Sequence, residues 1–309
     1  MTSSAPKAPQ LLSAKLKAAP HAAFFLLSAA AAVLGLIGTY LFYVRTSTGQ
    51  YIDESALDEA AHAQRAIGSP VAHFLDALPV TSVVIAAAVV LFVTLMRRRW
   101  RAAGIAVGAM AVANLSTQLI KYSLPDRPDR GIVTLGLNSL PSGHSTLAAS
   151  SAAAVFLVVS PRWRPVAAFV GGSYAVVSGI STLINQWHRP SDVVAAFLLV
   201  TFWTALAGLA IMRSGNSWNV WDGYGEHWAS SRLWPFLSVL AGVGAAVLAV
   251  VVLRQLTPSG GGHISTTNYF WAGVSLIVIC GYLLTVAGTL LFGLEARRRR
   301  VVRQSVRRR

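Results

Sequence analysis

Two short strings in this sequence carry residue types that could act together on a phosphate ester. The first, Pro-Ser-Gly-His, ends at His144, and the second, His-Arg-Pro-Ser-Asp, begins at His188 and ends at Asp192. Each string places a histidine at the start of a long apolar segment, and several cations lie nearby. Two imidazoles and a carboxylate are suited to nucleophilic and acid–base chemistry, and the cations are suited to holding an anion.

The second string predicts an activated histidine. His188 and Asp192 are four residues apart, so on a helix their side chains would share one face. A carboxylate next to an imidazole fixes the tautomer and stabilises the charged form of the ring. The same pair could instead make an ordinary hydrogen bond at a helix end. A zinc site formed by His144, His188 and Asp192 is a further alternative, which the surrounding cations disfavour.

The first string predicts the N-terminus of a helix at an anion-binding site. The first turn of a helix presents unpaired N–H groups and the positive end of the helix dipole. Gly143 permits the close approach of an anion, and Ser142 can cap the helix or donate a hydrogen bond. His144 would face the same anion. An ordinary serine N-cap without a ligand is the alternative.

A basic string upstream adds positive charge. Lys121 lies at the outer end of a predicted membrane span, and Arg127 follows it in the loop. Arginine binds phosphate oxygens with two parallel hydrogen bonds, and lysine acts as a point charge. The alternative is that both side chains extend towards lipid headgroups.

The elements that must position these residues are membrane helices. The chain has 309 residues, of which 54% are hydrophobic and 12% charged, roughly half the charged fraction of a soluble domain. A membrane-crossing helix needs about 20 apolar residues. We therefore predict an all-α fold, a polytopic transmembrane helix bundle, and a short amphipathic surface helix within 46–69. The eight predicted spans are 22–44, 78–96, 102–123, 145–160, 166–186, 191–212, 234–253 and 270–293.

The charge distribution predicts the orientation in the cell membrane. Most of the 26 basic residues fall on one side of the predicted spans. The positive-inside rule makes that side cytoplasmic, with both chain termini there and the two strings on the extracytoplasmic face. Most of the net charge of +15 is then explained by the orientation in the membrane and does not indicate a nucleic-acid partner. Four of the outside cations flank the strings, which favours an anion site: Lys121, Arg127, Arg130 and Arg189.

Taken together, the strings resemble the signature of the type 2 phosphatidic acid phosphatases, also called lipid phosphate phosphatases. That signature reads Lys-x-x-x-x-x-x-Arg-Pro, Pro-Ser-Gly-His and Ser-Arg-x-x-x-x-x-His-x-x-x-Asp, and the family shares its catalytic core with bacterial acid phosphatases and vanadium haloperoxidases. The resemblance covers 22–212 and implies a six-helix lipid phosphatase core at 21–212. We expect a disordered cytoplasmic N-terminus at 1–20, a Trp-rich loop with two extra C-terminal spans at 213–294, and a basic cytoplasmic tail at 295–309.

The resemblance also implies roles for individual residues. His188 would attack phosphorus to form a phosphohistidine, Asp192 would orient it, and His144 would protonate the leaving group. Neither a metal nor another cofactor is implied. The residues expected to bind the substrate phosphate are Lys121, Arg127, Ser142, Gly143, Ser181 and Arg130.

Two departures from the signature affect these expectations. Five residues separate Lys121 from Arg127 where the family has six. Thr182 stands where the family has an arginine, so another cation would have to replace that charge. Arg130 and Arg189 are the candidates, and Arg130 is favoured because Arg189 would point away on a regular helix.

The expected function is metal-independent hydrolysis of a lipid phosphate or lipid diphosphate, of polyprenyl or glycerolipid type, at the extracytoplasmic face. The expected partners are this substrate and membrane lipid, with a homo-oligomer or membrane partner possible through the last two spans. The alternative is a non-catalytic protein of the same fold that binds, transports or helps assemble lipid phosphates. Phosphoryl transfer to an acceptor other than water is a third hypothesis.

Overall fold

The computed structural model describes residues 22–67, 69–132, 138–214, 227–255 and 267–307. Every regular element in these ranges is helical, so the all-α prediction is confirmed. The long helices are α2 (Ala22–Thr39), α3 (Ser47–Ile67), α4 (Ser69–Arg97), α5 (Trp100–Ser123), α6 (Gly143–Val158), α7 (Arg164–Ile184), α8 (Pro190–Ser214), α9 (Leu233–Gln255) and α10 (Asn268–Arg307). Short turns of other helix types are η1 (Tyr40–Val44), η2 (Pro161–Trp163) and η3 (Trp228–Ser230).

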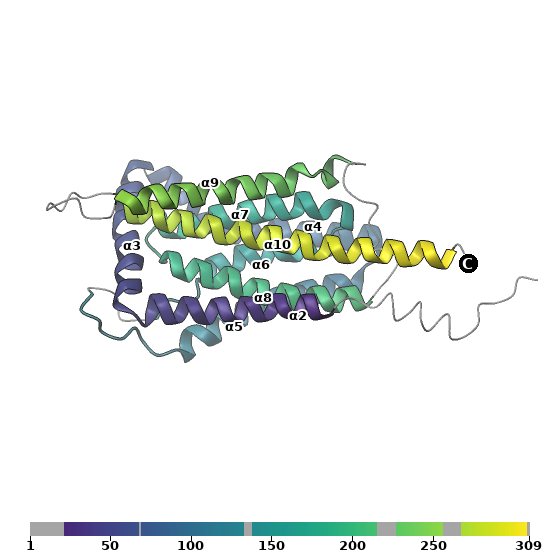
Figure 1. Ribbon diagram of the computed structural model, residues 1–309, viewed down its shortest axis with the longest axis horizontal. Helices are drawn as coiled ribbons and strands as arrows, with labels where there is room; N and C mark the ends of the chain where they lie inside the picture. Colours follow the sequence, from purple (N-terminus) through teal and green to yellow (C-terminus); the bar gives the residue numbers. More distant parts are fainter. Residues whose placement is uncertain (1–21, 68, 133–137, 215–226, 256–266, 308–309) are drawn as a thin grey trace, which may run out of the picture.

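The helices form a bundle whose members run side by side (Figure 1). Within the described ranges, 7 helices are long and apolar enough to cross a membrane, and the chain is therefore a multi-pass membrane protein. The fourth predicted span is the exception, because α6 has only 16 residues. This is shorter than the roughly 20 residues that cross the hydrocarbon core. α6 ends at Val158 because Pro161, three positions on, cannot continue a helix.

α6 nevertheless occupies the middle of the bundle. It packs against α4, α5, α7 and α8. Its buried residues are mostly alanine and serine, which let the neighbouring helices approach closely. A short helix enclosed by longer ones places its N-terminus, with His144, at a fixed depth near one end of the bundle.

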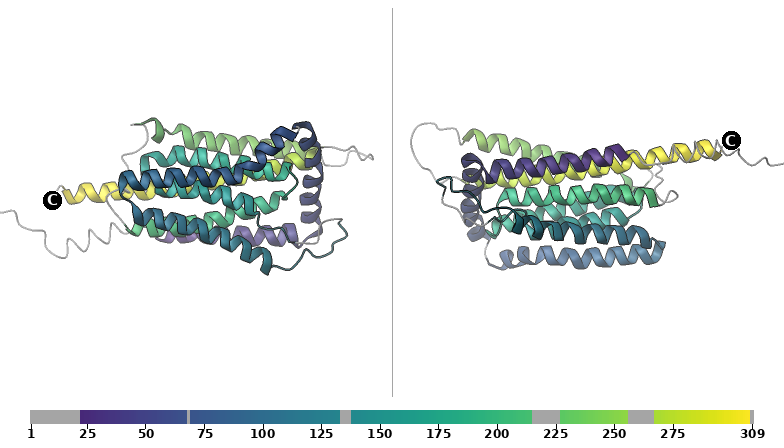
Figure 2. Two further views of the ribbon diagram at one scale, coloured as in Figure 1. Left: turned by 180° about the vertical axis from the view of Figure 1, so that it is seen from behind. Right: turned by 90° about the horizontal axis from the view of Figure 1, so that it is seen from below.

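The predicted amphipathic helix of the first loop is confirmed as α3. It has 21 residues and runs across one end of the bundle, roughly perpendicular to the spans (Figures 1 and 2). The prediction that it lies on the surface is only partly right, because one face is buried against the bundle. That face includes two acidic residues, Asp53 and Glu54, as well as Gln50, Ala56 and Ala60.

The last two spans are packed into the bundle. α10 contacts α9, and it also contacts α7, α8 and α3. It continues as a helix to Arg307, so most of the predicted basic tail extends this helix. The predicted N-terminal segment 1–20 and most of the Trp-rich loop lie outside the described residues.

The beginning of α2 and the end of α10 both lie away from α3, towards the opposite end of the bundle (Figures 1 and 2). That both termini are cytoplasmic stays a prediction. α3, with the loops that carry the two strings, lies at the other end.

Candidate active site

A hydrogen bond joins the two strings at the end of the bundle that α3 covers. The N–H of Ser142 donates to the backbone carbonyl of Asp192 at 2.9 Å. Ser142 also caps α6, because its Oγ accepts from the N–H of Ser145 at 3.3 Å. The prediction that the first string opens a helix is thus confirmed, since α6 begins at Gly143. The unpaired N–H groups of the first turn of α6 lie beside the second string.

His188 and Asp192 make the predicted contact, although His188 lies outside the helix. Its Nδ1 is 3.3 Å from Oδ2 of Asp192. The expectation that they share a helical face is wrong, because α8 begins only at Pro190. Instead the chain turns at Arg189, whose N–H also donates to Oδ2 of Asp192, at 3.2 Å. With Nδ1 engaged by the carboxylate, Nε2 of His188 is the nitrogen available to a substrate.

The end of α7 fixes the turn that precedes His188. The carbonyl of Thr182 accepts from the N–H groups of Trp187, at 2.9 Å, and of His188, at 3.2 Å. Gln186 has a φ of 59°, in the left-handed region, and this conformation lets the chain reverse within a few residues. Thr182 therefore supports the histidine through its backbone, at the position where an arginine side chain was expected.

His144 lies on the open side of His188. The centroids of the two imidazole rings are 6.2 Å apart, and the His144 ring also lies 4.9 Å from the ring of Trp187. His144 is exposed, whereas His188 is almost fully buried. Lys121 and Asp76 lie close enough to act electrostatically on His144. Both a basic and an acidic side chain therefore act on His144.

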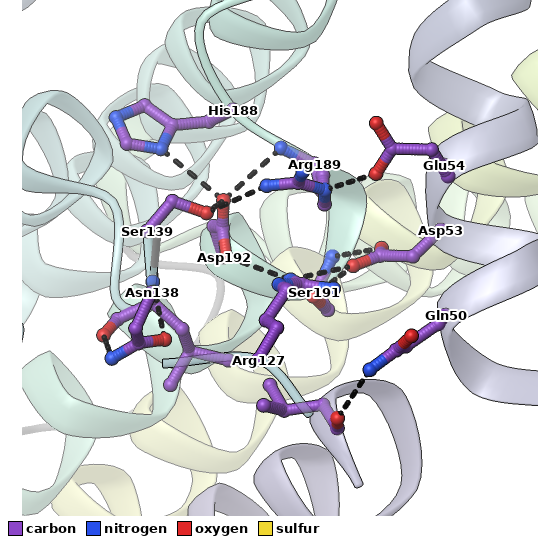
Figure 3. A network of polar contacts seen from close by, with 12 residues as sticks. Gln50, Asp53, Glu54, Arg127, Asn138, Ser139, His188, Arg189, Ser191 and Asp192 are labelled. Atoms are coloured by element: carbon purple, nitrogen blue, oxygen red, sulfur yellow. Dashed lines mark hydrogen bonds and ion pairs between the residues drawn. The ribbon is translucent and has the colours of Figure 1, made fainter. Parts of the chain in front are cut away.

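Asp192 is buried at the centre of a polar network (Figure 3). Besides the two contacts with His188 and Arg189, its Oδ2 accepts from Oγ of Ser139 at 2.7 Å. Nη1 of Arg189 donates to the same Ser139 Oγ at 3.0 Å. Three donors on one oxygen hold the carboxylate in a single orientation.

Arg127 enters this network from behind Asp192. Its Nη2 is 3.3 Å from Oδ2 of Asp53 and 3.8 Å from Oδ1 of Asp192, and its side chain is 0% exposed. Asp53 also accepts from Ser191, from the N–H at 3.0 Å and from the hydroxyl. Arg127 was expected to bind the substrate phosphate, and the structure places it between two carboxylates instead.

Arg189 is held in a similar way on the other side. Its Nε donates to Oε2 of Glu54 at 2.6 Å. Figure 3 shows that the Arg189 side chain extends towards Glu54, whereas the His188 ring points the other way. The neighbouring acidic residues Asp53 and Glu54 of α3 therefore each hold one arginine.

The electrostatics of Asp53 follow from its burial. Burial raises the pKa of Asp53 to about 6, and the negative charge of Asp192 adds to the rise. The positive charge of Arg127 and the two hydrogen bonds from Ser191 oppose it. Close to neutral pH the network therefore contains a carboxyl group that gains a proton more readily than an ordinary aspartate.

The other predicted cations lie outside this network. Lys121 is in the last turn of α5 and is partly exposed, and Arg130 is exposed in the following loop. Neither side chain makes a hydrogen bond or ion pair with another described residue. Both are free to meet an anion, and Lys121 lies close enough to His144 to act on it electrostatically.

The hydroxyl groups near the end of α7 are bonded within that helix. Oγ of Ser181 donates to the carbonyl of Ser178 at 2.6 Å, and Oγ1 of Thr182 donates to that of Gly179 at 2.8 Å. Both residues are buried. The structure thus places Ser181, another expected phosphate ligand, beneath the site with its proton already donated.

The two histidines and Asp192 are the residue types of the alternative zinc site. In the ranges that the structure describes, no three His, Cys, Asp or Glu side chains are arranged to hold a metal ion. The partners of Asp192 are hydrogen-bond donors and arginines, which stabilise an anionic carboxylate.

Sequence reasoning missed the contribution of α3 and of Ser139. Asp53 and Glu54 belong to an amphipathic pattern that is typical of a surface helix. A signal was available, because the chain has only 11 acidic residues against 26 basic ones. Two adjacent carboxylates in the predicted first outside loop are conspicuous in such a chain, and the cations near the strings are their natural partners.

The comparison with protein families identifies the part of the chain that carries this site. Residues 102–215 match the model of the PAP2 superfamily. No curated protein and no solved structure matched the chain. The matched segment runs from α5 to α8 and contains both histidine strings and the basic string. Over these residues the chain is similar to the PAP2 superfamily, and this similarity suggests phosphatase activity on phosphate esters.

Proposed function

We propose that this protein hydrolyses a lipid phosphate or lipid diphosphate, of polyprenyl or glycerolipid type, at the extracytoplasmic face of the cell membrane. The observation that carries the proposal is the pairing of His188 with Asp192 on one side and with His144, 6.2 Å away between ring centroids, on the other. This arrangement supplies a nucleophile, its orienting carboxylate and an exposed proton donor next to one another.

The reaction proceeds in two steps. Nε2 of His188 attacks phosphorus while the bond between phosphorus and the leaving oxygen breaks, which gives a phosphohistidine. The Nδ1–H of His188 remains donated to Asp192, and the carboxylate stabilises the positive charge that the ring acquires. His144 gives its proton to the leaving oxygen. His144 then removes a proton from the water that attacks the phosphohistidine, and inorganic phosphate and neutral His188 result.

The phosphoryl oxygens need donors where charge develops in the transition state. The N–H groups at the start of α6, beginning with Gly143, and the ammonium group of Lys121 lie on the side of His144. Arg130 is the exposed arginine of the adjacent loop and is our candidate for a second cation. We assign Arg127 a supporting role, because two carboxylates already hold it behind Asp192.

The position of the site favours a lipid over a soluble ester. His144 and His188 lie at the end of apolar helices whose outer faces expose large apolar side chains, for example Leu115 and Leu119 on α5. Trp187, beside His144, is 40% exposed, and tryptophan is typical of the membrane interface. A phosphate group at this level would leave its hydrocarbon chain in the membrane.

The test is phosphate release from a panel of lipid phosphates by the purified full-length protein in detergent, with EDTA present. The panel contains a polyprenyl diphosphate, a phosphatidylglycerol phosphate and a phosphatidic acid. We expect release from at least one of them, loss of nearly all activity in His188→Ala, and normal activity in His227→Ala, which changes a histidine at the opposite end of the bundle. Phosphate-labelled enzyme should be trapped under alkaline conditions, because phosphohistidine is labile in acid.

Wild-type turnover by His188→Ala would show that this mechanism is wrong. Tight binding of a lipid phosphate without release would instead support the non-catalytic alternative. Transfer of the phosphoryl group to an added alcohol in place of water would identify a transferase with the same covalent intermediate.

A further inference from the structure

We propose that the last helix, α10, is a positioning element of the active site and acts on it through Pro190 and α3. The proposal rests on the proposed phosphatase function. It extends the site beyond the six helices that the family resemblance assigns to the catalytic core.

The first link is a close approach between α10 and the start of α8. Gly273 is buried, and a Cβ atom added to it would lie 2.6 Å from Cγ of Pro190 and 3.2 Å from Cβ of Ala56. Only glycine allows the α10 backbone to come this near to a rigid proline ring and to α3 at once. Pro190 is two positions after His188 and begins the helix that carries Asp192. The backbone of α10 therefore packs directly against Pro190, which follows the turn that carries His188.

The second link is the attachment of α10 to α3. Oε2 of Glu59 accepts from the N–H of Phe270 at 2.8 Å, which caps an unpaired N–H in the first turn of α10. The rings of Tyr51 and Tyr269 meet edge to face with centroids 5.5 Å apart. Both contacts join the same two helices near the start of α10.

An apolar cluster lies beneath these polar contacts. Its buried members come from α3, α7, α8 and α10: Ala60, Ala175, Val176, Leu183, Val193, Phe197, Phe270, Val274 and Ile277. Ile277 of α10 and Val193 of α8 are fully buried. Since Val193 follows Asp192 directly, α10 packs against the residue next to the catalytic carboxylate.

The third link leads from α3 to the reacting residues. Asp53 holds Arg127 and the N–H of Ser191, and Glu54 holds Arg189. A shift of α3 would therefore move both arginines and the start of α8 together. Misplacing a reacting group by about 1 Å can reduce the rate about 100-fold. Turnover should thus depend on the position in which α10 holds α3.

Three glycines give a matched test: Gly273 and Gly288 of α10, and Gly208 of α8. An added Cβ at Gly273 meets Pro190 near the site, whereas at Gly208 it would lie 2.3 Å from Cζ of Phe292, in a different apolar cluster towards the opposite end of the bundle. At Gly288 it would meet nothing within 4 Å. We would measure kcat, KM and the thermal midpoint for the three single alanine variants of the full-length protein in detergent.

Gly273→Ala should lower kcat about tenfold or more. Gly208→Ala should lower the thermal midpoint at least as much but keep a nearly normal kcat, and Gly288→Ala should match the wild type in both. A normal kcat in Gly273→Ala would overturn the proposal, as would equal losses of kcat in Gly273→Ala and Gly208→Ala.

A second pair of variants applies if Gly273→Ala does not fold. Glu59→Ala removes the cap of α10, and Glu59→Gln keeps an oxygen that accepts from Phe270. The proposal predicts a lower kcat for Glu59→Ala and recovery in Glu59→Gln. A normal kcat in both variants, or an equal loss in both, contradicts it.

A readout that needs no turnover separates this proposal from the proposed function. Diethyl pyrocarbonate modifies neutral imidazoles, and mass spectrometry reports its rate at His188. We expect His188 to be modified at the same rate in the wild type and in Gly288→Ala. In Gly273→Ala we expect a different rate. Equal rates in all three proteins would overturn the role of α10 even if phosphatase activity is found. A changed rate in a protein that releases no phosphate would support α10 and refute the phosphatase.

Discussion

Nε of Arg189 lies 2.6 Å from Oε2 of Glu54, and this ion pair connects the residue after the proposed nucleophile to a helix 135 positions earlier. The arginine was considered as a replacement for the one that the family carries at Thr182. Its geometry indicates a different role, because its side chain extends away from the His188 ring. It donates to Oγ of Ser139, which in turn donates to Asp192. A buried ion pair of this kind is costly to break when one partner remains.

Removal of Arg189 should therefore destabilise the protein. Arg189→Ala removes this ion pair from Glu54, whose side chain is only 12% exposed, and we expect a loss of about 3 kcal/mol in the free energy of unfolding. The double variant Glu54→Ala/Arg189→Ala should recover part of that loss. Reversible unfolding in detergent measures all three variants. Arg45→Ala, which removes an exposed arginine, is the control, and strictly additive effects of the two substitutions would contradict a direct pair.

The raised pKa of Asp53 predicts how stability depends on pH. The pKa is about 6 in the folded protein and 3.8 for an ordinary aspartate, so the folded state binds this proton more tightly. The resulting contribution to stability is complete below about pH 4 and is lost as the pH rises through about 6.

Asp53→Asn removes this titration. We expect wild-type stability, relative to the variant, to fall between pH 4 and pH 7, as measured by unfolding at a series of pH values. Asp126→Asn changes an exposed aspartate, and its stability should vary with pH in the same way as that of the wild type. A wild-type protein that becomes more stable than Asp53→Asn over the same range would show that Arg127 and Ser191 outweigh burial.

The spans could be predicted from the sequence because a membrane imposes a minimum length on apolar segments. α6 is the exception, because it was predicted as a span but has only 16 residues. Its composition is as apolar as that of its neighbours, but other helices enclose it and Pro161 follows soon after its end. Length alone could not reveal a helix that is buried within the bundle.

The site could be predicted only as far as local spacing reaches. His188 and Asp192 meet because four positions keep them within one turn of chain, whether or not that turn is helical. Asp53 meets Ser191 across 138 positions, and that contact depends on α3 lying over the end of the bundle. The side-chain pattern of α3 reports which face is apolar, but it contains no information about which other helix that face covers.

The orientation in the membrane remains a prediction that labelling can test. Cysteine introduced at Asp126, in the exposed loop before the first string, should react with an impermeant thiol reagent in intact cells. Cysteine at Ser214, at the far end of α8, should not react, because the charge distribution places that end in the cytoplasm. Cys280→Ser provides the background. The opposite pattern would place the site in the cytoplasm and exclude an extracytoplasmic substrate.

The role of His144 as proton donor predicts a dependence on the leaving group. An alkyl oxygen of a lipid phosphate is a poor leaving group and needs a proton, whereas nitrophenolate leaves without one. His144→Ala should therefore lower turnover of the lipid phosphate about 100-fold or more, since general acid catalysis contributes about 100- to 10,000-fold. The first turnover of p-nitrophenyl phosphate should be nearly unaffected, and rapid-mixing measurement of nitrophenol release records it.

The first turnover is the informative quantity because His144 also acts as a base when water attacks the phosphohistidine. His144→Ala should therefore show a burst of nitrophenol followed by slow steady-state release. His188→Ala should show no burst, because it cannot form the covalent intermediate. Equal losses on both substrates in the first turnover would mean that His144 places the phosphoryl group, together with Trp187, and does not transfer the proton.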